Sequence, residues 1–315
     1  MARVLVTRRL PSGGIDPLVA AGHEIVAREH DIAYTTDELR EAVDGVDAIV
    51  SLLTDRIDSS IIERGAPLLK VVANVAVGYD NIDIGAATSA GVAVCNTPGV
   101  LDETTADLAF LLILAASRCA SEAEADLRGD RWPGWGINQY LGHDVHGASL
   151  GLVGYGHIGR AVGRRAAGFG MQVLHHTRTD TGEAGWRTDL DAMLGECEIV
   201  SLHVPLDDAT RHLFDADRLR RMRPGSVLVN TARGPVVDEQ ALAVALEDGH
   251  LFAAGLDVFE REPQIHPRLL AAPRTVLLPH IGSASTATRT RMARLACEGA
   301  VAVLAGERPP NLVAG

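Results

Sequence analysis

The segment ASLGLVGYGHIG, residues 148–159, joins a short apolar run to a glycine-rich turn. The run 148–153 predicts a buried strand. Beyond the turn, apolar residues recur at helical spacing as far as Phe169, and the run 171–176 predicts a second strand. A strand, a glycine turn, a helix and a second strand form the βαβ unit of a parallel sheet.

The glycines of this unit have the spacing G-x-G-x-x-G. Gly154 permits a tight turn, Gly156 lets the backbone approach a pyrophosphate, and Gly159 lets the helix pack closely on the strand. The N-terminus of the helix offers N–H groups and the positive end of its dipole to phosphates. In this context the motif predicts a dinucleotide site, and a turn that serves only packing is the alternative.

The end of the second strand carries information about the cofactor. An NAD site usually has an Asp or Glu about 20 residues after the glycines, which binds the ribose 2′-OH, but residues 175–179 read HHTRT. Arg178 can bind a 2′-phosphate, and Thr177 or Thr179 can add a hydroxyl. We therefore predict a preference for NADP(H), with NAD(H) possible. The alternative is that Arg178 points only to water.

Length and charge narrow the class of protein. A chain of 315 residues is long for one core and predicts two domains. Its formal net charge of −12, without a basic run, argues against a nucleic-acid partner.

Residues 1–9 lack the apolar core of a signal peptide, and no apolar run is long enough to span a membrane, so we expect a cytoplasmic protein. The four cysteines fit neither a zinc nor a disulfide pattern, and we expect them in the core.

Strands alternate with helices along the chain, which predicts parallel, wound sheets. The expected strands outside the βαβ unit are 3–7, 23–28, 48–53, 71–75, 92–95, 198–204, 226–232, 252–258 and 275–278. An apolar helix at 103–120 should lead from the first domain into the second. A last helix at 286–304 and the tail should return to the first domain and make it discontinuous.

The loop 131–136, RWPGWG, differs from its surroundings because it holds two tryptophans among proline and glycine. Such a loop cannot build a core by itself. We expect an arm that buries Trp132 and Trp135 elsewhere, for example on a second subunit; the alternative is a cap on its own domain.

Three residues near strand or loop ends suit hydride transfer to a carbonyl, which needs a proton donor, a cation for a carboxylate and a group that tunes the donor. Arg233 follows the strand 226–232 and can grip a carboxylate through two parallel bonds. His280 follows a strand end and is a natural proton donor near neutral pH. Glu262 alone resembles a solvated loop carboxylate, but beside His280 it would orient the ring and favour its charged form. The spacing does not show that they meet.

Several motifs, taken in order, resemble the D-2-hydroxyacid dehydrogenase family, and within it the glyoxylate/hydroxypyruvate reductases. The resemblance covers nearly the whole chain. Besides the glycine motif it rests on LLTD (52–55), NVAVGYDNID (74–83), NTPGV (96–100), ETTAD (103–107), NTARG (230–234), AGLDVF (254–259), EP (262–263) and LPHIGS (278–283).

The resemblance implies an α/β fold of two doubly wound parallel-sheet domains. A Rossmann domain for the dinucleotide, residues 99–286, would be inserted in a discontinuous, flavodoxin-like substrate-binding domain, residues 1–98 and 287–315. The active site would lie in the cleft between them. The protein would be a homodimer, and Trp132 or Trp135 of the neighbouring subunit would wall the substrate pocket.

The resemblance also implies roles for the candidate residues. Arg233 would bind the α-carboxylate and polarise the carbonyl, and His280 would donate the proton with Glu262 as its partner. Leu53 and the backbone at Val77 and Gly78 would contact the substrate. Asp257 would contact the nicotinamide amide. The other expected cofactor contacts are Thr105, Gly154, Gly156, His157, Ile158, Gly159, Thr177, Arg178, Thr179, Val204, Pro205, Thr231, Ala232, Arg233, His280 and Gly282.

The sequence therefore predicts an NAD(P)-dependent oxidoreductase of EC class 1.1.1 that reduces a small 2-oxo acid, such as glyoxylate or hydroxypyruvate, to the D-2-hydroxy acid. A D-lactate or phosphoglycerate dehydrogenase is an alternative within the family. A non-catalytic protein that senses dinucleotides is an alternative from another class.

Overall fold

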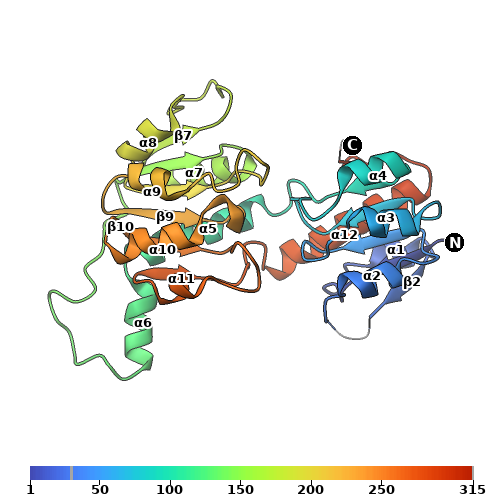
Figure 1. Ribbon diagram of the computed structural model, residues 1–315, viewed down its shortest axis with the longest axis horizontal. Coiled ribbons are helices and arrows are strands. Elements are labelled where there is room, and N and C mark those ends of the chain that lie inside the picture. The colour runs from blue at the N-terminus through green and yellow to red at the C-terminus, as the bar shows by residue number, and fades with distance from the viewer. Residues whose placement is uncertain (29–30, 314–315) are drawn as a thin grey trace. The chain divides into compact units, whose positions relative to one another are not determined.

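The computed structural model describes residues 1–28 and 31–313. The chain forms two compact units. Unit 1 comprises Met1–Leu101 and Ser283–Gly315, and unit 2 comprises Asp102–Gly282. Each unit has one parallel sheet with helices on both faces (Figure 1), which confirms the predicted α/β class with two doubly wound sheets. The units divide at 101/102 and 282/283, where the sequence led us to expect 98/99 and 286/287.

Unit 1 contains a five-stranded sheet of order β2-β1-β3-β4-β5. Its strands are β1 Arg3–Val6, β2 Glu24–Ala27, β3 Ala48–Ser51, β4 Val71–Asn74 and β5 Ala93–Cys95. Its helices are α1 Asp16–Ala20, α2 Thr36–Ala42, α3 Ser59–Gly65, α4 Ile84–Ala90 and α12 Thr286–Leu304. Strands β3 and β4 are buried throughout, as expected for apolar runs in a parallel sheet covered on both faces.

The end of the chain belongs to unit 1. Helix α12 packs on β3, β4 and β5 and contributes Met292, Ala296 and Ala300 to one of the two cores of this unit. After the helix, Leu312 forms an antiparallel bridge with Cys95 beside the edge strand β5. The C-terminal segment therefore completes a sheet whose other elements all lie in the first third of the chain.

Unit 2 contains a six-stranded sheet of order β11-β10-β9-β8-β6-β7. Its strands are β6 Ser149–Val153, β7 Gln172–His176, β8 Ile199–Leu202, β9 Ser226–Asn230, β10 Leu251–Leu256 and β11 Thr275–Leu277. Its helices are α5 Asp102–Ser117, α6 Ala120–Arg128, α7 His157–Gly168, α8 Leu190–Glu196, α9 Ala216–Arg221, the 3₁₀ turn Gly234–Val236, α10 Glu239–Glu247 and α11 Pro267–Ala271.

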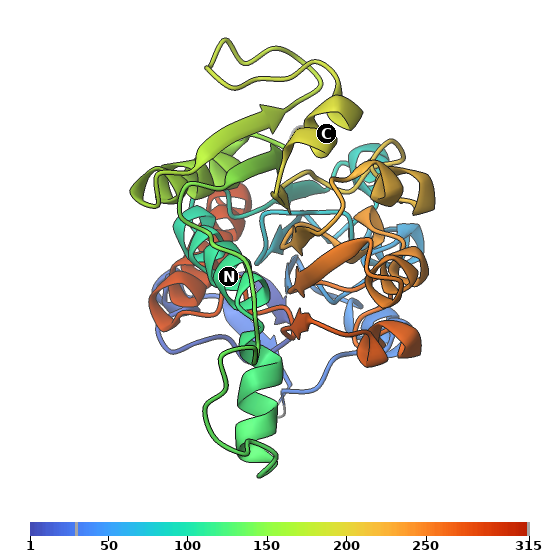
Figure 2. The ribbon, with the colours of Figure 1, turned by 90° about the vertical axis from the view of Figure 1, so that its left-hand side faces the viewer.

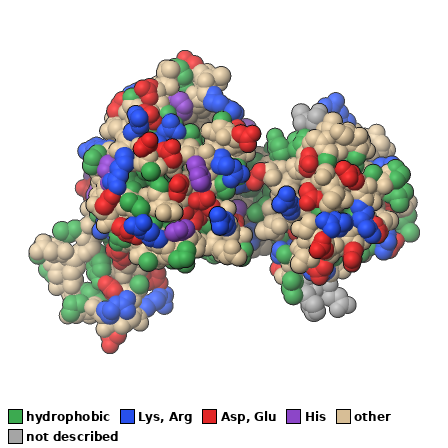
Figure 3. All heavy atoms as spheres, viewed as in Figure 1, with side chains coloured by type: hydrophobic (Ala, Val, Ile, Leu, Met, Phe, Trp, Pro, Cys, Tyr) green, Lys and Arg blue, Asp and Glu red, His purple; other side chains and the backbone are tan. Residues whose placement is uncertain are grey.

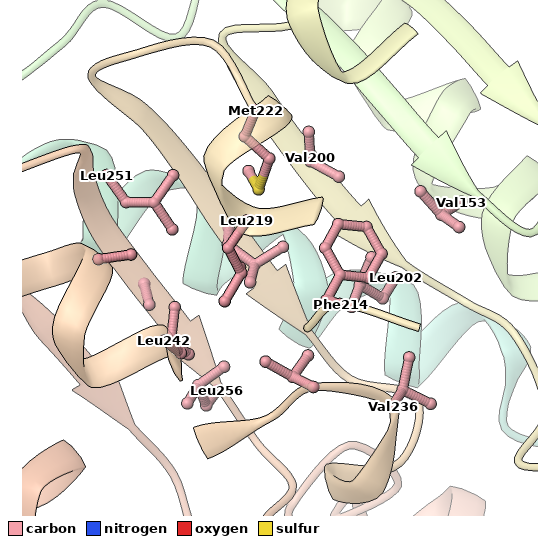
Figure 4. Close-up of a cluster of buried hydrophobic side chains, with 14 of the residues drawn as sticks. Val153, Val200, Leu202, Phe214, Leu219, Met222, Val236, Leu242, Leu251 and Leu256 are labelled. Carbon is pink, nitrogen blue, oxygen red and sulfur yellow. The ribbon is translucent and has the colours of Figure 1, made fainter. Parts of the chain in front are cut away.

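The strand order of unit 2 reverses at β6. The chain leaves β6 for β7 on one side and then crosses to β8 on the other. Helices α5 and α7 cover one face of the sheet, and α8 to α11 cover the opposite face, whose core includes Phe214, Leu219 and Leu242 (Figure 4). Open α/β sheets bind ligands beyond the carboxyl ends of their strands at such a reversal. The fold thus places the turn after β6 at the expected ligand edge.

One expected helix is two helices. The helix expected at 103–120 ends at Ser117, and Cys119 takes a left-handed conformation with φ of 53° before α6 begins. No single helix in the described ranges is long and apolar enough to cross a membrane; α5 and α6 together meet that test, but they are bent by 70° at the break.

Helix α6 and the loop after it form an arm, residues 120–143, that projects from unit 2 (Figures 1 and 2). None of the side chains of α6 is buried. The arm exposes the large apolar side chains of Leu127, Trp132, Trp135, Ile137 and Leu141. Trp135 is 80% exposed and Trp132 is 48% exposed. Trp135 is therefore mostly exposed to solvent, whereas Trp132 is about half covered.

Candidate active site

His280 and Glu262 lie in contact in unit 2. His280 follows Pro279 just beyond β11, and its ring Nδ1 lies 2.8 Å from Glu262 Oε2. The side chains are 25% and 28% exposed, so both are largely shielded from water yet still reachable. The contact that sequence spacing could not show is thus present in the structure. With Nδ1 bound to a carboxylate, Nε2 is the ring nitrogen left for a substrate.

The charge on Glu262 is maintained by its surroundings. Burial opposes ionisation of Glu262, but three neighbouring groups favour it. They are His280, through its hydrogen bond and its charge, the Phe259 N–H and the Arg233 guanidinium, and together they lower the pKa of Glu262. The Phe259 N–H donates to Glu262 Oε1 over 3.0 Å. An ionised Glu262 is an acceptor only, so the bonded Nδ1 carries the proton.

The loop that carries Glu262 is held by a second, buried carboxylate. Glu239, at the start of α10, accepts the Glu260 N–H at Oε1 over 2.6 Å and the His266 N–H at Oε2 over 2.9 Å. Both ends of the loop are therefore fixed. Sequence reasoning missed Glu239, because nothing in its local pattern separates it from a solvated helix carboxylate.

The backbone around Arg233 is also fixed by one buried side chain. Asn230, the last residue of β9, donates from Nδ2 to the Arg233 carbonyl and accepts the Ala232 N–H at Oδ1, both over 2.9 Å. The Arg233 guanidinium donates to the Ala232 carbonyl over 2.9 Å. Gly234 then packs against the backbone of Phe259, so the Arg233 turn and the Glu262 loop are in direct contact.

Asp257 organises the turn that presents His280. Its Oδ1 accepts the Ile281 N–H over 2.7 Å and its Oδ2 accepts the Gly282 N–H over 2.8 Å, while its backbone carbonyl accepts the His280 N–H. Burial raises the pKa of Asp257, against the effect of these N–H groups. Thr105, from α5, donates to the Gly282 carbonyl over 3.4 Å. The structure thus brings together four of the expected site residues at one turn.

The glycine turn has the geometry of a pyrophosphate cradle. Gly154 has φ of 90°, and a Cβ there would lie 2.6 Å from the His203 carbonyl oxygen. A Cβ on Gly159 would collide with the Gly154 carbonyl, whereas one on Gly156 would meet nothing within 4 Å. No side chain caps α7 at Gly156, so the first N–H groups of this helix are available for phosphate oxygens.

A second observation supports a ligand at the same edge. The hydroxyl of Thr231, one residue beyond β9, is buried and lacks a hydrogen-bond partner among the described residues. Buried hydroxyls are normally paired, so an unpaired one needs an explanation. A dinucleotide laid along the carboxyl ends of β6, β8 and β9 would supply a partner. The residues present therefore fit the predicted cofactor.

The expected substrate-contacting backbone lies in unit 1. Val77 and Gly78 follow β4, and their carbonyls accept the side-chain amides of Asn96 over 2.8 Å and Asn74 over 3.0 Å. Leu53 follows β3 in the neighbouring loop. These residues are grouped within unit 1, whereas Arg233, Glu262 and His280 are grouped within unit 2.

Comparison with known proteins then decides the family. The model of the D-isomer specific 2-hydroxyacid dehydrogenase NAD binding domain matches residues 110–282, more than half of the chain. The chain belongs to the D-isomer specific 2-hydroxyacid dehydrogenase family. The dehydrogenase is 44% identical to a glyoxylate reductase of Thermococcus litoralis over 99% of the chain and 96% of that relative.

Solved structures are similar to this chain over nearly its whole length. A protein from Thermus thermophilus is 44% identical, with a TM-score of 0.94, over 99% of this chain and 100% of that one. An NADPH-dependent glyoxylate/hydroxypyruvate reductase from Sinorhizobium meliloti, solved in complex with NADP and malonate, is 33% identical with a TM-score of 0.87, over 99% of this chain and 97% of that one.

At the end of β7, residues that the sequence predicts for a 2′-phosphate have hydrogen-bond partners within the chain. The Thr177 hydroxyl, expected to be available for a 2′-phosphate, accepts from Trp186 Nε1 over 3.2 Å and donates to the Thr179 carbonyl over 2.6 Å. Arg178 is 77% exposed, but its Nη1 lies 3.3 Å from Asp207 Oδ2. Sequence reasoning missed Asp207, which lies two residues after the expected cofactor contacts Val204 and Pro205.

Proposed function

We propose that this dehydrogenase reduces a small 2-oxo acid, glyoxylate or hydroxypyruvate, to the D-2-hydroxy acid with NADPH as the preferred reductant. The observation that carries the proposal is the 2.8 Å contact of His280 with an ionised Glu262, on a loop that touches the Arg233 turn. The glyoxylate reductases among the relatives, one of them solved with NADP, support the choice of substrate and reductant.

Each side chain has a distinct task in this reaction. Arg233 binds the substrate carboxylate with its planar fork and draws electron density from the adjacent carbonyl. His280 donates a proton to the carbonyl oxygen, and Glu262 orients the ring through its contact with Nδ1. When bound, the reduced nicotinamide supplies the hydride to the carbonyl carbon. We also propose that the backbone at Val77 and Gly78 binds substrate.

The preference for NADPH follows from the end of β7. The sequence there, HHTRT, has no carboxylate for a 2′-OH, and Arg178 presents an exposed guanidinium that can bind a 2′-phosphate. We predict a lower Michaelis constant for NADPH than for NADH, and Arg178→Gln should remove most of that difference. A clear preference of the wild type for NADH would contradict this part of the proposal.

We propose that the protein is a homodimer located in the cytoplasm, and the arm is the feature that favours the homodimer. Exposed apolar side chains on one projecting segment mark a protein interface more often than a free surface. The space-filling view shows hydrophobic side chains on the surface of the arm (Figure 3). We propose that Trp132 or Trp135 walls the pocket of a partner subunit. Replacing both with alanine should lower the molar mass measured by light scattering; an unchanged oligomer would contradict this use of the arm.

A panel of 2-oxo acids tests the activity itself. NADPH oxidation is followed with glyoxylate, hydroxypyruvate, pyruvate and phenylpyruvate. We expect the highest kcat/KM with one of the first two. A marked preference for pyruvate would instead favour a D-lactate dehydrogenase. NADPH binding without turnover of any of the four acids would favour a sensing protein.

A further inference from the structure

An ion pair spans the carboxyl edge of unit 2 at the glycine turn. Arg178 follows β7 and Asp207 follows β8, and β6, which leads into the glycine turn, lies between those two strands in the sheet. The pair thus joins segments on either side of the turn that cradles the pyrophosphate. In this fold the ribose of the adenosine half lies near the end of the second strand, where Arg178 stands.

Asp207 is the fixed member of this pair. Its Oδ1 accepts the Ala209 N–H over 3.0 Å and the Thr210 N–H over 2.9 Å, and its own N–H donates to the Thr210 hydroxyl over 2.8 Å. Burial opposes ionisation, but the hydrogen bonds from Thr210 and Ala209 and the charge of Arg178 lower the pKa of Asp207. Asp207 is 38% exposed against 77% for Arg178, so the carboxylate stays in place and the guanidinium is the part that can move.

We infer that Asp207 is a specificity-determining residue that opposes the 2′-phosphate and limits the preference for NADP(H) that Arg178 confers. The inference rests on the proposed function, in which Arg178 binds that phosphate. The guanidinium must exchange a rigid carboxylate for the phosphate dianion, which then lies close to a like charge. A 2′-hydroxyl carries no charge, so its binding neither requires Arg178 to leave Asp207 nor places a like charge beside Asp207.

Asp207 could instead assist binding of the 2′-phosphate, and this alternative role predicts the opposite effect of its removal. If the carboxylate served to aim Arg178 at the phosphate, its removal would weaken binding of a 2′-phosphorylated nucleotide. Asp207→Asn separates the two roles, because the amide oxygen of asparagine still accepts the N–H groups of Ala209 and Thr210 and keeps the turn intact. Asp208→Asn is the matched control, since it removes the same charge from the adjacent exposed position.

The experiment measures binding of adenosine 2′,5′-bisphosphate and 5′-AMP to the full-length protein by titration calorimetry, without substrate, at about 0.05 M salt. In Asp207→Asn, we expect the bisphosphate to bind about three- to tenfold more tightly and 5′-AMP to stay within about twofold of the wild type. Asp208→Asn should change neither by more than about twofold. The gain should shrink at about 0.5 M salt, where surface charges are screened.

Two results would overturn the inference: weaker bisphosphate binding in Asp207→Asn, or a gain no larger than that of Asp208→Asn. The inference and the proposed function can fail separately, since the titration needs no turnover. If Asp207→Asn bound the bisphosphate selectively more tightly but the protein reduced no 2-oxo acid, the role of Asp207 would be supported and the proposed activity excluded. If the protein reduced 2-oxo acids but Asp207→Asn and Asp208→Asn bound the bisphosphate equally well, only the role of Asp207 would be excluded.

Discussion

Gly234→Ala should move the Arg233 turn away from the Glu262 loop while leaving every proposed active-site side chain unchanged. Gly234 follows Arg233 and lies against the backbone that leads to Glu262. An added Cβ would meet the carbonyl carbon and oxygen of Phe259 and the nitrogen of Glu260, all nearer than the 3.0 Å that real Cβ atoms respect. All three are backbone atoms, so no flexible side chain can move aside. The Arg233 turn and the Glu262 loop must part instead.

The size of the effect follows from that separation. Carbon atoms pack at about 3.5–4.0 Å, and the added Cβ would lie far inside that distance from the Phe259 carbonyl carbon, so the two segments must move apart by more than about 1 Å. A misplacement of about 1 Å at a reacting centre costs about 100-fold in rate. We therefore predict that kcat/KM for glyoxylate falls about 100-fold, or about 2.7 kcal/mol of transition-state stabilisation. Overpacking should also cost about 1–3 kcal/mol of folding stability.

The assay is steady-state oxidation of NADPH by glyoxylate, at a temperature below the measured Tm of the variant. NADPH affinity, which depends on the glycine turn, should stay within about threefold. Gly168→Ala is the matched control, because Gly168 ends α7 and a Cβ there would meet nothing within 4 Å. If folded Gly234→Ala kept a kcat/KM within about threefold of Gly168→Ala, the contact would not position the site as argued.

The remaining predictions concern the three side chains directly. His280→Gln should lower turnover roughly 100- to 10,000-fold while the NADPH dissociation constant, measured by fluorescence titration, changes little; a comparable loss of NADPH binding would oppose the role. Arg233→Lys should raise the glyoxylate KM and lower kcat, each more than about tenfold, since an ammonium cannot replace the planar fork, and a normal KM would count against it. Because the pKa of Glu262 is lowered from 4.5, the stabilisation it gives exists above that pH and is lost as pH falls through the folded value. Chemical denaturation should therefore show a larger loss of stability below about pH 5 in the wild type than in Glu262→Gln, and equal losses would refute this.

Local signals predicted most of the fold. The strands predicted at 198–204 and 226–232 contain β8 and β9, whose residues are all buried because a parallel sheet hides both faces of its strands. The glycine turn was recognisable from the spacing of its glycines, of which Gly154 and Gly159 each meet a separate steric demand within the chain. The break before α6 was not, since Cys119 adopts a positive φ without the glycine or proline that usually marks such a point.

The candidate site was predictable only as separate residues. Glu262 and His280 are 18 positions apart, and their contact depends on the turn that Asp257 holds through two backbone N–H groups. Arg178 and Asp207 are 29 positions apart and meet because the strand order reverses at β6. Periodicity reports the face of an element, but it does not report which loops meet at the edge of a sheet.

Isotope transfer tests the central claim most directly. NADPH deuterated at both C4 positions is incubated with hydroxypyruvate and the wild-type protein or His280→Gln, and the product is examined by NMR. We predict one deuterium at C2 of the hydroxy acid formed by the wild type, at a rate at least about 100-fold above that of the variant. A product without deuterium at C2, or equal rates in the two proteins, would contradict hydride reduction of a 2-oxo acid with His280 as proton donor.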